Sequence, residues 1–182
     1  PEVVGRETVA AARRVSNPGC YPTGFIALVA PLVRSGLLPA DWPDGCKAVS
    51  GYSGAGKALI GRLEDDPDIA FRSYGLGLGH KHVAEMQKLA ALAHPPVFSP
   101  AVIPAHRGMV VDVQLPLGAM PVAGSPDALR AALADFYAAS PIVVMGDAPA
   151  DGEMMLRASD VGDDRSELFV FANADASQAR LV

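Results

Sequence analysis

The chain has few of the residues that mark several large classes of protein. Only two of its 182 residues are cysteine, Cys20 and Cys46, and that is too few for the disulfide framework of a secreted protein. No apolar run reaches the roughly 18 residues that a membrane span needs, and the net charge of −5 comes without a cluster of Lys or Arg. We therefore expect a cytoplasmic protein with free thiols whose partners are neither nucleic acid nor membrane.

The rest of the composition is that of an ordinary globular domain. Half of the residues are apolar and 19% are charged, which is enough for a sizeable core. A length of 182 residues suits a single domain, and no linker divides 1–182. The chain starts at Pro1 and stops within ASQARLV, which resembles an unfinished element, so we expect it to be part of a longer protein.

The apolar pattern predicts a mixture of helices and strands. Helices are expected near 22–38, 82–94 and 126–137, and strands at 47–50, 110–115, 142–145, 154–157 and 168–171. Segment 9–15 fits a strand or a short helix, and segment 58–66 fits a helical turn or a loop. Together these elements predict an α+β fold, with one sheet and helices on one of its sides.

Cys20 lies in the stretch SNPGCYPTG (16–24), about two residues before the expected helix start. The unpaired N–H groups and the positive dipole end of a helix favour a thiolate, and the same groups can bind an oxyanion. Gly19 has no side chain and so leaves room for a substrate or another part of the backbone to approach closely. The alternative is that Cys20 is a small buried apolar residue, as many lone cysteines are. Cys46 has no comparable setting and is interpreted as structural.

A nucleophilic thiol needs a partner that handles protons, and His80 and His82 are the candidates among four histidines. Residues two apart in a loop point in different directions, so we expect at most one of them to face the thiol. Glu85, three residues past His82, lies on the same helix face and could orient it. A zinc site would need two further ligands that the sequence does not offer. Arg107 is a candidate for two-point binding of a carboxylate or phosphate.

The glycine-rich stretch GYSGAGK (51–57) has the GxxxxGK spacing of a nucleotide-binding P-loop, but Ala58 stands where that motif needs Ser or Thr. Its Ser53, Gly54 and Lys57 still suit a phosphorylated ligand, since glycines admit an anion and the lysine adds a positive charge. GLGLGH (75–80) lacks the βαβ context of a dinucleotide fingerprint. If the enzyme uses a dinucleotide, most of that site lies outside this chain.

Three segments in this order resemble the N-acetyl-gamma-glutamyl-phosphate reductase family, in its short form. They are SNPGCYPTG, SGYSGAGK and GLGLGHKHVAEMQ, and PAHRGM and VFANADASQARLV are also similar to that family. The resemblance covers nearly the whole chain. The departures are Lys57, where many members have Arg, Gly79, and Val83-Ala84, which is often Leu-Pro. Aspartate-semialdehyde dehydrogenase and glyceraldehyde-phosphate dehydrogenase are wider relatives.

The resemblance implies that residues 1–182 form the catalytic, substrate-binding and dimerisation domain, without the dinucleotide-binding Rossmann domain. The implied fold has a mixed, largely antiparallel sheet with helices packed on one face, like the C-terminal domain of glyceraldehyde-phosphate dehydrogenase. The implied site residues are Cys20 and His82 for catalysis, His80, Glu85, Ser53, Gly54, Lys57 and Arg107 for the substrate, and Pro22, Thr23 and Gly24 for the cofactor. A homo-oligomer, either a dimer or a tetramer, is implied as well.

The implied reaction is NADPH-dependent reductive dephosphorylation of N-acetyl-glutamyl phosphate through a thioester on Cys20, in arginine biosynthesis. No metal is expected. Three alternatives stay open: a dimerisation or binding domain inactive by itself, a related acyl-phosphate reductase such as aspartate-semialdehyde dehydrogenase, and a cysteine hydrolase. The P-loop hypothesis is weakened by Ala58.

Overall fold

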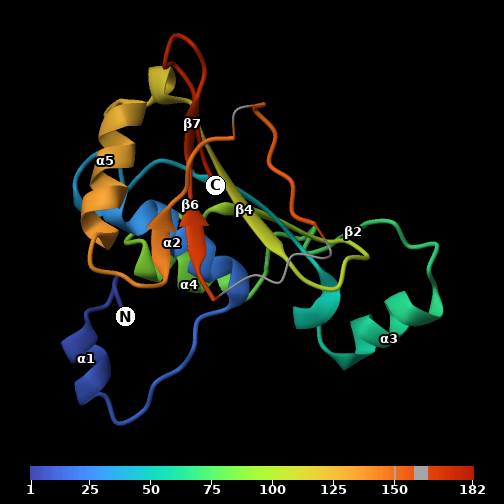
Figure 1. Ribbon diagram of the computed structural model, residues 1–182. Coiled ribbons are helices and arrows are strands. Elements are labelled where there is room, and N and C mark those ends of the chain that lie inside the picture. The colour runs from blue at the N-terminus through green and yellow to red at the C-terminus, as the bar shows by residue number, and fades with distance from the viewer. Residues whose placement is uncertain (150, 158–163) are drawn as a thin grey trace.

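A computed structural model describes residues 1–149, 151–157 and 164–182 (Figure 1). The helices are α1 (Arg6–Ala11), α2 (Cys20–Arg34), α3 (Lys57–Asp65), α4 (His82–Leu89) and α5 (Pro126–Tyr137), with short 3₁₀ turns at Tyr52–Gly54 and Leu117–Ala119. The strands are β1 (Gly45–Ser50), β2 (Arg72–Ser73), β3 (Val97–Val102), β4 (Met109–Leu115), β5 (Val143–Met145), β6 (Ser166–Leu168), β7 (Val170–Ala172) and β8 (Ala179–Leu181).

The main sheet has six strands in the order β2-β3-β1-β4-β8-β7. Only β1 and β3 run parallel, joined by a crossover that contains α3, β2 and α4, and every other pair in this sheet is antiparallel. A second, smaller sheet pairs β5 with β6 in parallel. The expected mixed, largely antiparallel α+β architecture is therefore confirmed.

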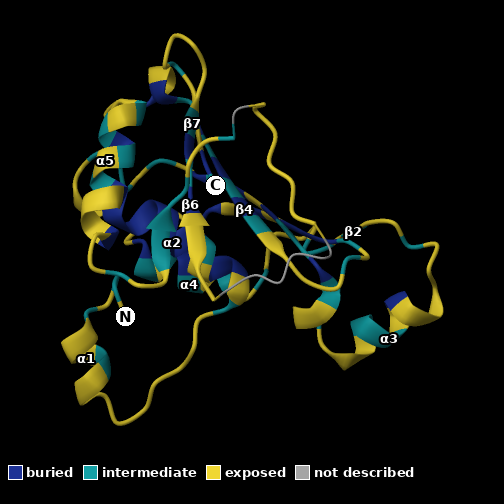
Figure 2. Cartoon of the chain, in the orientation of Figure 1, coloured by how far each residue is buried: buried dark blue, intermediate teal, exposed yellow. Residues whose placement is uncertain are grey.

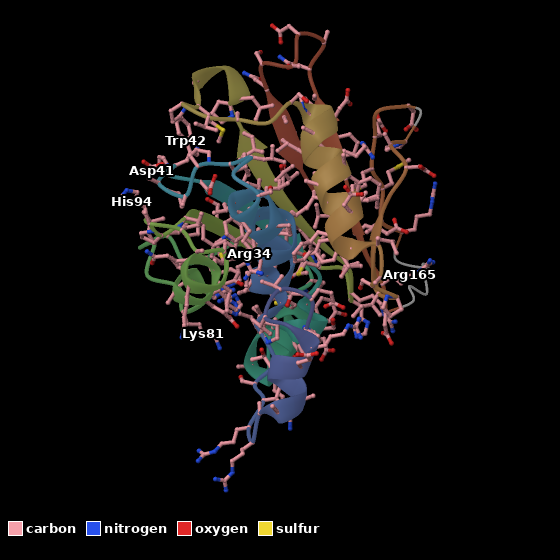
Figure 3. All side chains as sticks on the ribbon, turned by 90° about the vertical axis from the view of Figure 1, so that its left-hand side faces the viewer. Arg34, Asp41, Trp42, Lys81, His94 and Arg165 are labelled. Carbon is pink, nitrogen blue, oxygen red and sulfur yellow. The ribbon has the colours of Figure 1, made fainter. Side chains whose placement is uncertain are left out.

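Helices α2, α4 and α5 lie on one side of the main sheet (Figures 1 and 3). Helix α2 packs against α4, α5 and β4. On β4 the buried side chains of Val111, Val113 and Leu115 alternate with the partly exposed Asp112 and Gln114, as expected when only one face of a strand is covered. The core therefore lies between α2 and the central strands. No helix of the described residues is long and apolar enough to cross a membrane.

Helix α2 differs from its prediction at both ends. It begins at Cys20 rather than near Pro22, with Gly19 as its N-cap, so the thiol belongs to the first helical residue. It ends at Arg34 rather than Leu38 because Gly36 adopts a left-handed conformation with φ of 72°. The amide of Leu37 then bonds back to the carbonyl of Leu32, the pattern of a Schellman cap.

Helix α4 is shorter than predicted for the same kind of reason. It was expected to run to His94, but it ends at Leu89, and Ala91 adopts a left-handed φ of 58°. The amide of Leu92 donates to the carbonyl of Gln87, which closes the helix five residues before His94. A glycine usually occupies this left-handed position after a helix, and an alanine rarely does. The sequence therefore carried no sign that the helix ends here.

The strand predictions were right for some strands of each sheet and wrong or missing for others. Strands β1, β4 and β5 confirm 47–50, 110–115 and 142–145, whereas residues 154–157 form no strand. The single strand expected at 168–171 is two, because Leu168 ends β6 and Val170 starts β7 in the other sheet. Strands β3 and β8 were not predicted. Proline has no N–H to donate to a neighbouring strand. Within β3, Pro100 is tolerated because the hydrogen bond that it cannot make would go to the short β2.

The remaining predictions concern helices. Helix α5 confirms 126–137, with Ser125 accepting a hydrogen bond from the amide of Ala128 as its N-cap. Segment 58–66 forms most of α3, and segment 9–15 overlaps α1 rather than a strand. None of the residues of α1 is buried (Figure 2).

Candidate active site

Cys20 occupies the first turn of α2, and its side chain is exposed. Because Cys20 and Tyr21 are the first residues of the helix, their amide N–H groups have no intrahelical acceptor, and Pro22 has no N–H at all. The thiol therefore sits directly beside two backbone donors that bond no acceptor among the described residues. The alternative interpretation of Cys20 as a buried apolar residue is wrong; that description fits Cys46, which is buried in the core and whose pKa burial raises to about 12.

His82, the first residue of α4, packs against the residue that precedes this thiol. A Cβ atom placed on Gly19 would lie 2.4 Å from Nε2 of His82, so only glycine permits the contact. Nδ1 of His82 is buried and has no hydrogen-bond partner among the described residues. Burial lowers the pKa of His82, the neighbouring His80 lowers it further, and Glu85 opposes both. The imidazole is thus held neutral near pH 7.

His80 lies beside His82 rather than pointing away from it. The two ring centroids are 4.5 Å apart, and Nδ1 of His80 accepts a hydrogen bond from the backbone amide of His82 at 3.2 Å. The helical conformation of Lys81 produces this tight turn. Both rings line the same cavity as Cys20. The expectation that at most one of them faces the thiol stays a prediction. Burial, followed by the charge of Lys81, lowers the pKa of His80.

Glu85 does not line that cavity. Its carboxylate oxygens accept hydrogen bonds from the backbone amide of Gly19 at 3.3 and 3.2 Å. The carboxylate therefore bonds to the residue before Cys20, and among the described residues no hydrogen bond joins it to His82.

The cavity has a volume of about 890 Å³ and is open to solvent. It is bounded by the first turn of α2, the end of β1 with the glycine-rich loop, β2, and the turn before α4. Its described lining includes Arg72, Lys81 and the two histidines, and no Asp or Glu. Such a cavity favours an anionic ligand. Figure 3 shows Lys81 at the edge of the molecule.

The glycine-rich loop contributes less to anion binding than its sequence predicts. Ser53 and Gly54 line the cavity, but the amides of Gly51, Tyr52 and Ser53 already donate to carbonyls of 105–108 at 2.8–2.9 Å. A P-loop binds phosphate with amides of this kind, and here three are occupied. The P-loop hypothesis is therefore not supported.

Lys57 and Arg107 are exposed, and neither lines the cavity. Lys57 begins α3, and Arg107 belongs to the loop that holds the glycine-rich segment. Their expected roles in substrate binding remain predictions. Among the described residues no group of three His, Cys, Asp or Glu is placed to hold a metal ion.

The residues expected to bind the cofactor differ in accessibility. Pro22 is buried, and Gly24 packs so closely on β4 that a Cβ atom would lie 2.8 Å from the side chain of Val111. Thr23 is exposed, and its hydroxyl donates to the carbonyl of Gly19. Of the three, Thr23 alone presents a side chain to solvent beside Cys20.

Sequence reasoning missed Arg72 and Tyr74. The guanidinium carbon of Arg72 lies 4.5 Å from the centroid of the Tyr74 ring, a cation–π contact, and both residues line the cavity. The hydroxyl of Tyr21 donates to the carbonyl of Ala101 and bonds Ser50 at 2.7 Å. The sequence FRSYG (71–75) could have indicated this pair, because residues two apart on a strand lie on the same face.

Comparisons with known proteins assign most of the chain to one family. Residues 20–182 match the family described as "Semialdehyde dehydrogenase, dimerisation domain". The chain belongs to this family. The match begins at the exposed thiol and covers every described residue of the cavity. The semialdehyde dehydrogenase dimerisation domain is thus the part of the chain that carries the candidate site.

Curated relatives of this dimerisation domain have names that agree with one another. The chain is 40% identical over 190 residues to the N-acetyl-gamma-glutamyl-phosphate reductase of Trichormus variabilis and 45% identical over 186 residues to that of Brucella ovis. Each alignment covers 97% of this chain but only 59% of the relative. The chain therefore spans about three-fifths of the length of these proteins.

Solved structures share the fold at low identity. Aspartate semialdehyde dehydrogenase II from Vibrio cholerae matches with a TM-score of 0.60 and 18% identity, over 92% of this chain and 55% of that one. A probable aspartate-semialdehyde dehydrogenase from Pseudomonas aeruginosa matches with a TM-score of 0.58 and 18% identity, over 96% and 58%. These likenesses establish the fold of the dimerisation domain.

Proposed function

We propose that residues 1–182 are the catalytic, substrate-binding and dimerisation domain of an NADPH-dependent N-acetyl-gamma-glutamyl-phosphate reductase. The observation that carries the proposal is the exposed Cys20 thiol at a helix N-terminus, in a cavity with two imidazoles, Arg72, and no described carboxylate. The names of the relatives supply the substrate, N-acetyl-gamma-glutamyl phosphate. We propose arginine biosynthesis as its pathway, as the resemblance implies. A cytoplasmic location follows from that role.

The thiolate of Cys20 attacks the acyl carbon of the substrate, and the oxyanion that forms is within reach of the free amides of the first turn of α2. When the tetrahedral adduct collapses, the C–O bond to phosphate breaks and a thioester remains on Cys20. NADPH, when bound beside this chain, would supply the hydride that brings the thioester to the oxidation level of the aldehyde. The C–S bond then breaks, which releases the semialdehyde and restores the thiolate.

His82 is the acid and base of this sequence. Nδ1 is buried and has no hydrogen-bond partner among the described residues, so a proton that serves the reaction is carried on Nε2, the atom that lies against Gly19 beside Cys20. It can donate that proton to the oxyanion of the reduced adduct and take it back as the C–S bond breaks. His80 binds the substrate from the adjacent position.

The positively charged side of the cavity binds the anionic groups of the substrate. Arg72 offers a planar fork for a carboxylate or phosphate, and stacking on Tyr74 restricts its orientation. Ser53 and Gly54 border the same space. We include Arg72 in the substrate site on the strength of this arrangement.

The described residues contain no Gly-rich dinucleotide loop, so NADPH would be held mainly by a further domain. Cys20 is exposed, and a thioester there would be open to a cofactor bound next to this chain. Thr23, one turn along α2, is the residue best placed to contact it. The residues present thus fit a cofactor held largely from outside.

The test uses the full-length protein that contains this chain. It should oxidise N-acetyl-glutamate 5-semialdehyde with NADP⁺ only when phosphate or arsenate is supplied. Cys20→Ser should abolish this turnover, whereas Cys46→Ala, a change at the buried thiol, should retain it. The chain alone should transfer no hydride from NADPH, as expected for a dimerisation domain without its cofactor domain.

Other outcomes would refute the proposal. Phosphate-independent hydrolysis without NADPH would favour a cysteine hydrolase. Turnover of aspartate semialdehyde in preference to the N-acetylated substrate would favour the related acyl-phosphate reductase. Full activity of Cys20→Ser would exclude the thioester route altogether.

A further inference from the structure

Glu85 is a partly buried carboxylate without a cationic partner among the described residues. It is absent from the cavity lining. Both of its oxygens bond one backbone N–H, that of Gly19, 66 positions earlier in the chain. Its charge is therefore directed to the Pro18–Gly19 peptide rather than to the space where a substrate would lie.

This contact does the work of a helix cap supplied from another helix. In a capping box, a Glu at the third helical position reaches back to the N–H of the N-cap residue. Here Gly19 is the N-cap of α2 and has no side chain to cap the helix, and the acceptor comes from the first turn of α4. The positive ends of both helix dipoles favour a carboxylate at this position.

The same turn of α4 contacts Gly19 twice. Glu85 bonds its amide, and the ring of His82 occupies the place where a Cβ atom would project. Because the Gly19 amide is occupied, the amides of Cys20 and Tyr21 are the free donors at this end of α2. The direction in which these donors point therefore depends on how Gly19 is held.

We propose that Glu85 is a positioning residue, which holds the Pro18–Gly19 peptide, and with it the backbone of Gly19, against the first turn of α4 and so fixes the sulfur of Cys20 relative to His82. The inference rests on the proposed role of Cys20 as the nucleophile. It replaces the expected role of Glu85 in substrate binding, because the carboxylate faces the backbone of α2 and not the cavity.

Amide hydrogen exchange at Gly19, followed by NMR, tests the contact without reference to any reaction. Glu85→Ala should accelerate amide exchange at Gly19 about tenfold, the factor expected from the loss of one charge-assisted hydrogen bond. Glu85→Gln keeps an oxygen acceptor and should restore most of the protection. Lys88→Ala, an exposed change on the same helix, is the control and should leave Gly19 unchanged.

Steady-state kinetics of the full-length protein test the consequence. Glu85→Ala should lower kcat by roughly 10- to 100-fold with little change in KM, because misplacement of the nucleophile acts on the chemical step. Glu85→Gln should recover most of kcat.

Two results would overturn the proposal: unchanged exchange at Gly19 in Glu85→Ala, or a raised KM with kcat retained, as for a substrate-binding residue. If instead Cys20→Ser remains active, the proposed function fails, while the exchange result at Gly19 still decides whether Glu85 holds this peptide.

Discussion

Single residues decide the chemistry at two places in this chain. At Gly19 the missing Cβ atom lets the ring of His82 approach, and any side chain there would displace the ring or the peptide. At Asp44 the effect comes from a side chain that is present, because its carboxyl group is buried where water is excluded. Asp44 is 2% exposed, and burial raises its pKa from 3.8 to about 6.

The buried carboxyl of Asp44 predicts a pH dependence of stability. Because its pKa is raised, the folded state binds the proton more tightly than the unfolded chain does. Its contribution is greatest below about pH 4 and is lost as the pH rises through 6, with a total on the order of 3 kcal/mol in the free energy of unfolding. Asp44→Asn should therefore be more stable than the original chain at pH 8 and should flatten the profile between pH 4 and 7.

Urea denaturation across this pH range measures the effect. Asp41→Asn, an exposed change in the same loop, is the matched control and should follow the original profile. Parallel profiles for the original chain and Asp44→Asn would show that this carboxyl does not titrate as described.

At the scale of elements, α2 and α5 are joined by a bond that compensates for a proline. Pro31 lies inside α2 and has no N–H to donate to the carbonyl of Ala27, four residues earlier. The hydroxyl of Tyr137, at the end of α5, donates to that carbonyl at 2.9 Å. The gap in one helix is thus filled by a side chain of its neighbour.

Removing this hydroxyl should destabilise the fold in a way that depends on the proline. Tyr137→Phe leaves the carbonyl of Ala27 unpaired and should lower the free energy of unfolding by about 1–2 kcal/mol. In a Pro31→Ala background the helix supplies its own N–H, so the same change should cost less. A double-mutant cycle in urea measures the coupling, and additive effects would refute the compensation.

At the scale of the whole molecule, the main sheet is covered by α2, α4 and α5 on one face and by no described helix of comparable length on the other (Figures 1 and 3). The strand register places Lys47, Ser99 and Asp112 together on that open face, with Arg180 bonding Asp112 at 2.6 Å. Since the family is a dimerisation domain, we expect a second copy to pack there.

A bulky charge on the open face should therefore weaken association. Ser99 is exposed on this face beside Lys47 of the central strand β1, so Ser99→Arg should shift the protein towards the monomer in light scattering coupled to size exclusion. Ala131→Arg, on the exposed surface of α5, should leave the oligomer intact. A dimer that tolerates Ser99→Arg and dissociates with Ala131→Arg would place the interface on the helical side.

Local patterns in the sequence determined much of this molecule. The alternation of apolar and polar residues predicted β4. The Ser125-Pro126 cap and the helical spacing of apolar residues predicted α5. The NPGCYPT and His-x-His segments indicated Cys20, His80 and His82, which line one cavity. Each of these features is encoded within about a dozen neighbouring residues, where turn chemistry and hydrophobic period act directly.

Tertiary structure alone decided the rest. The left-handed Ala91 that ends α4, the split of 168–171 between two sheets, and the pairing of Arg72 with the cavity depend on partners distant in sequence. So does the bond between Glu85 and Gly19, 66 positions apart. Contacts of this kind are set by how helices and strands pack, and a one-dimensional pattern carries no record of which backbone group a side chain will meet.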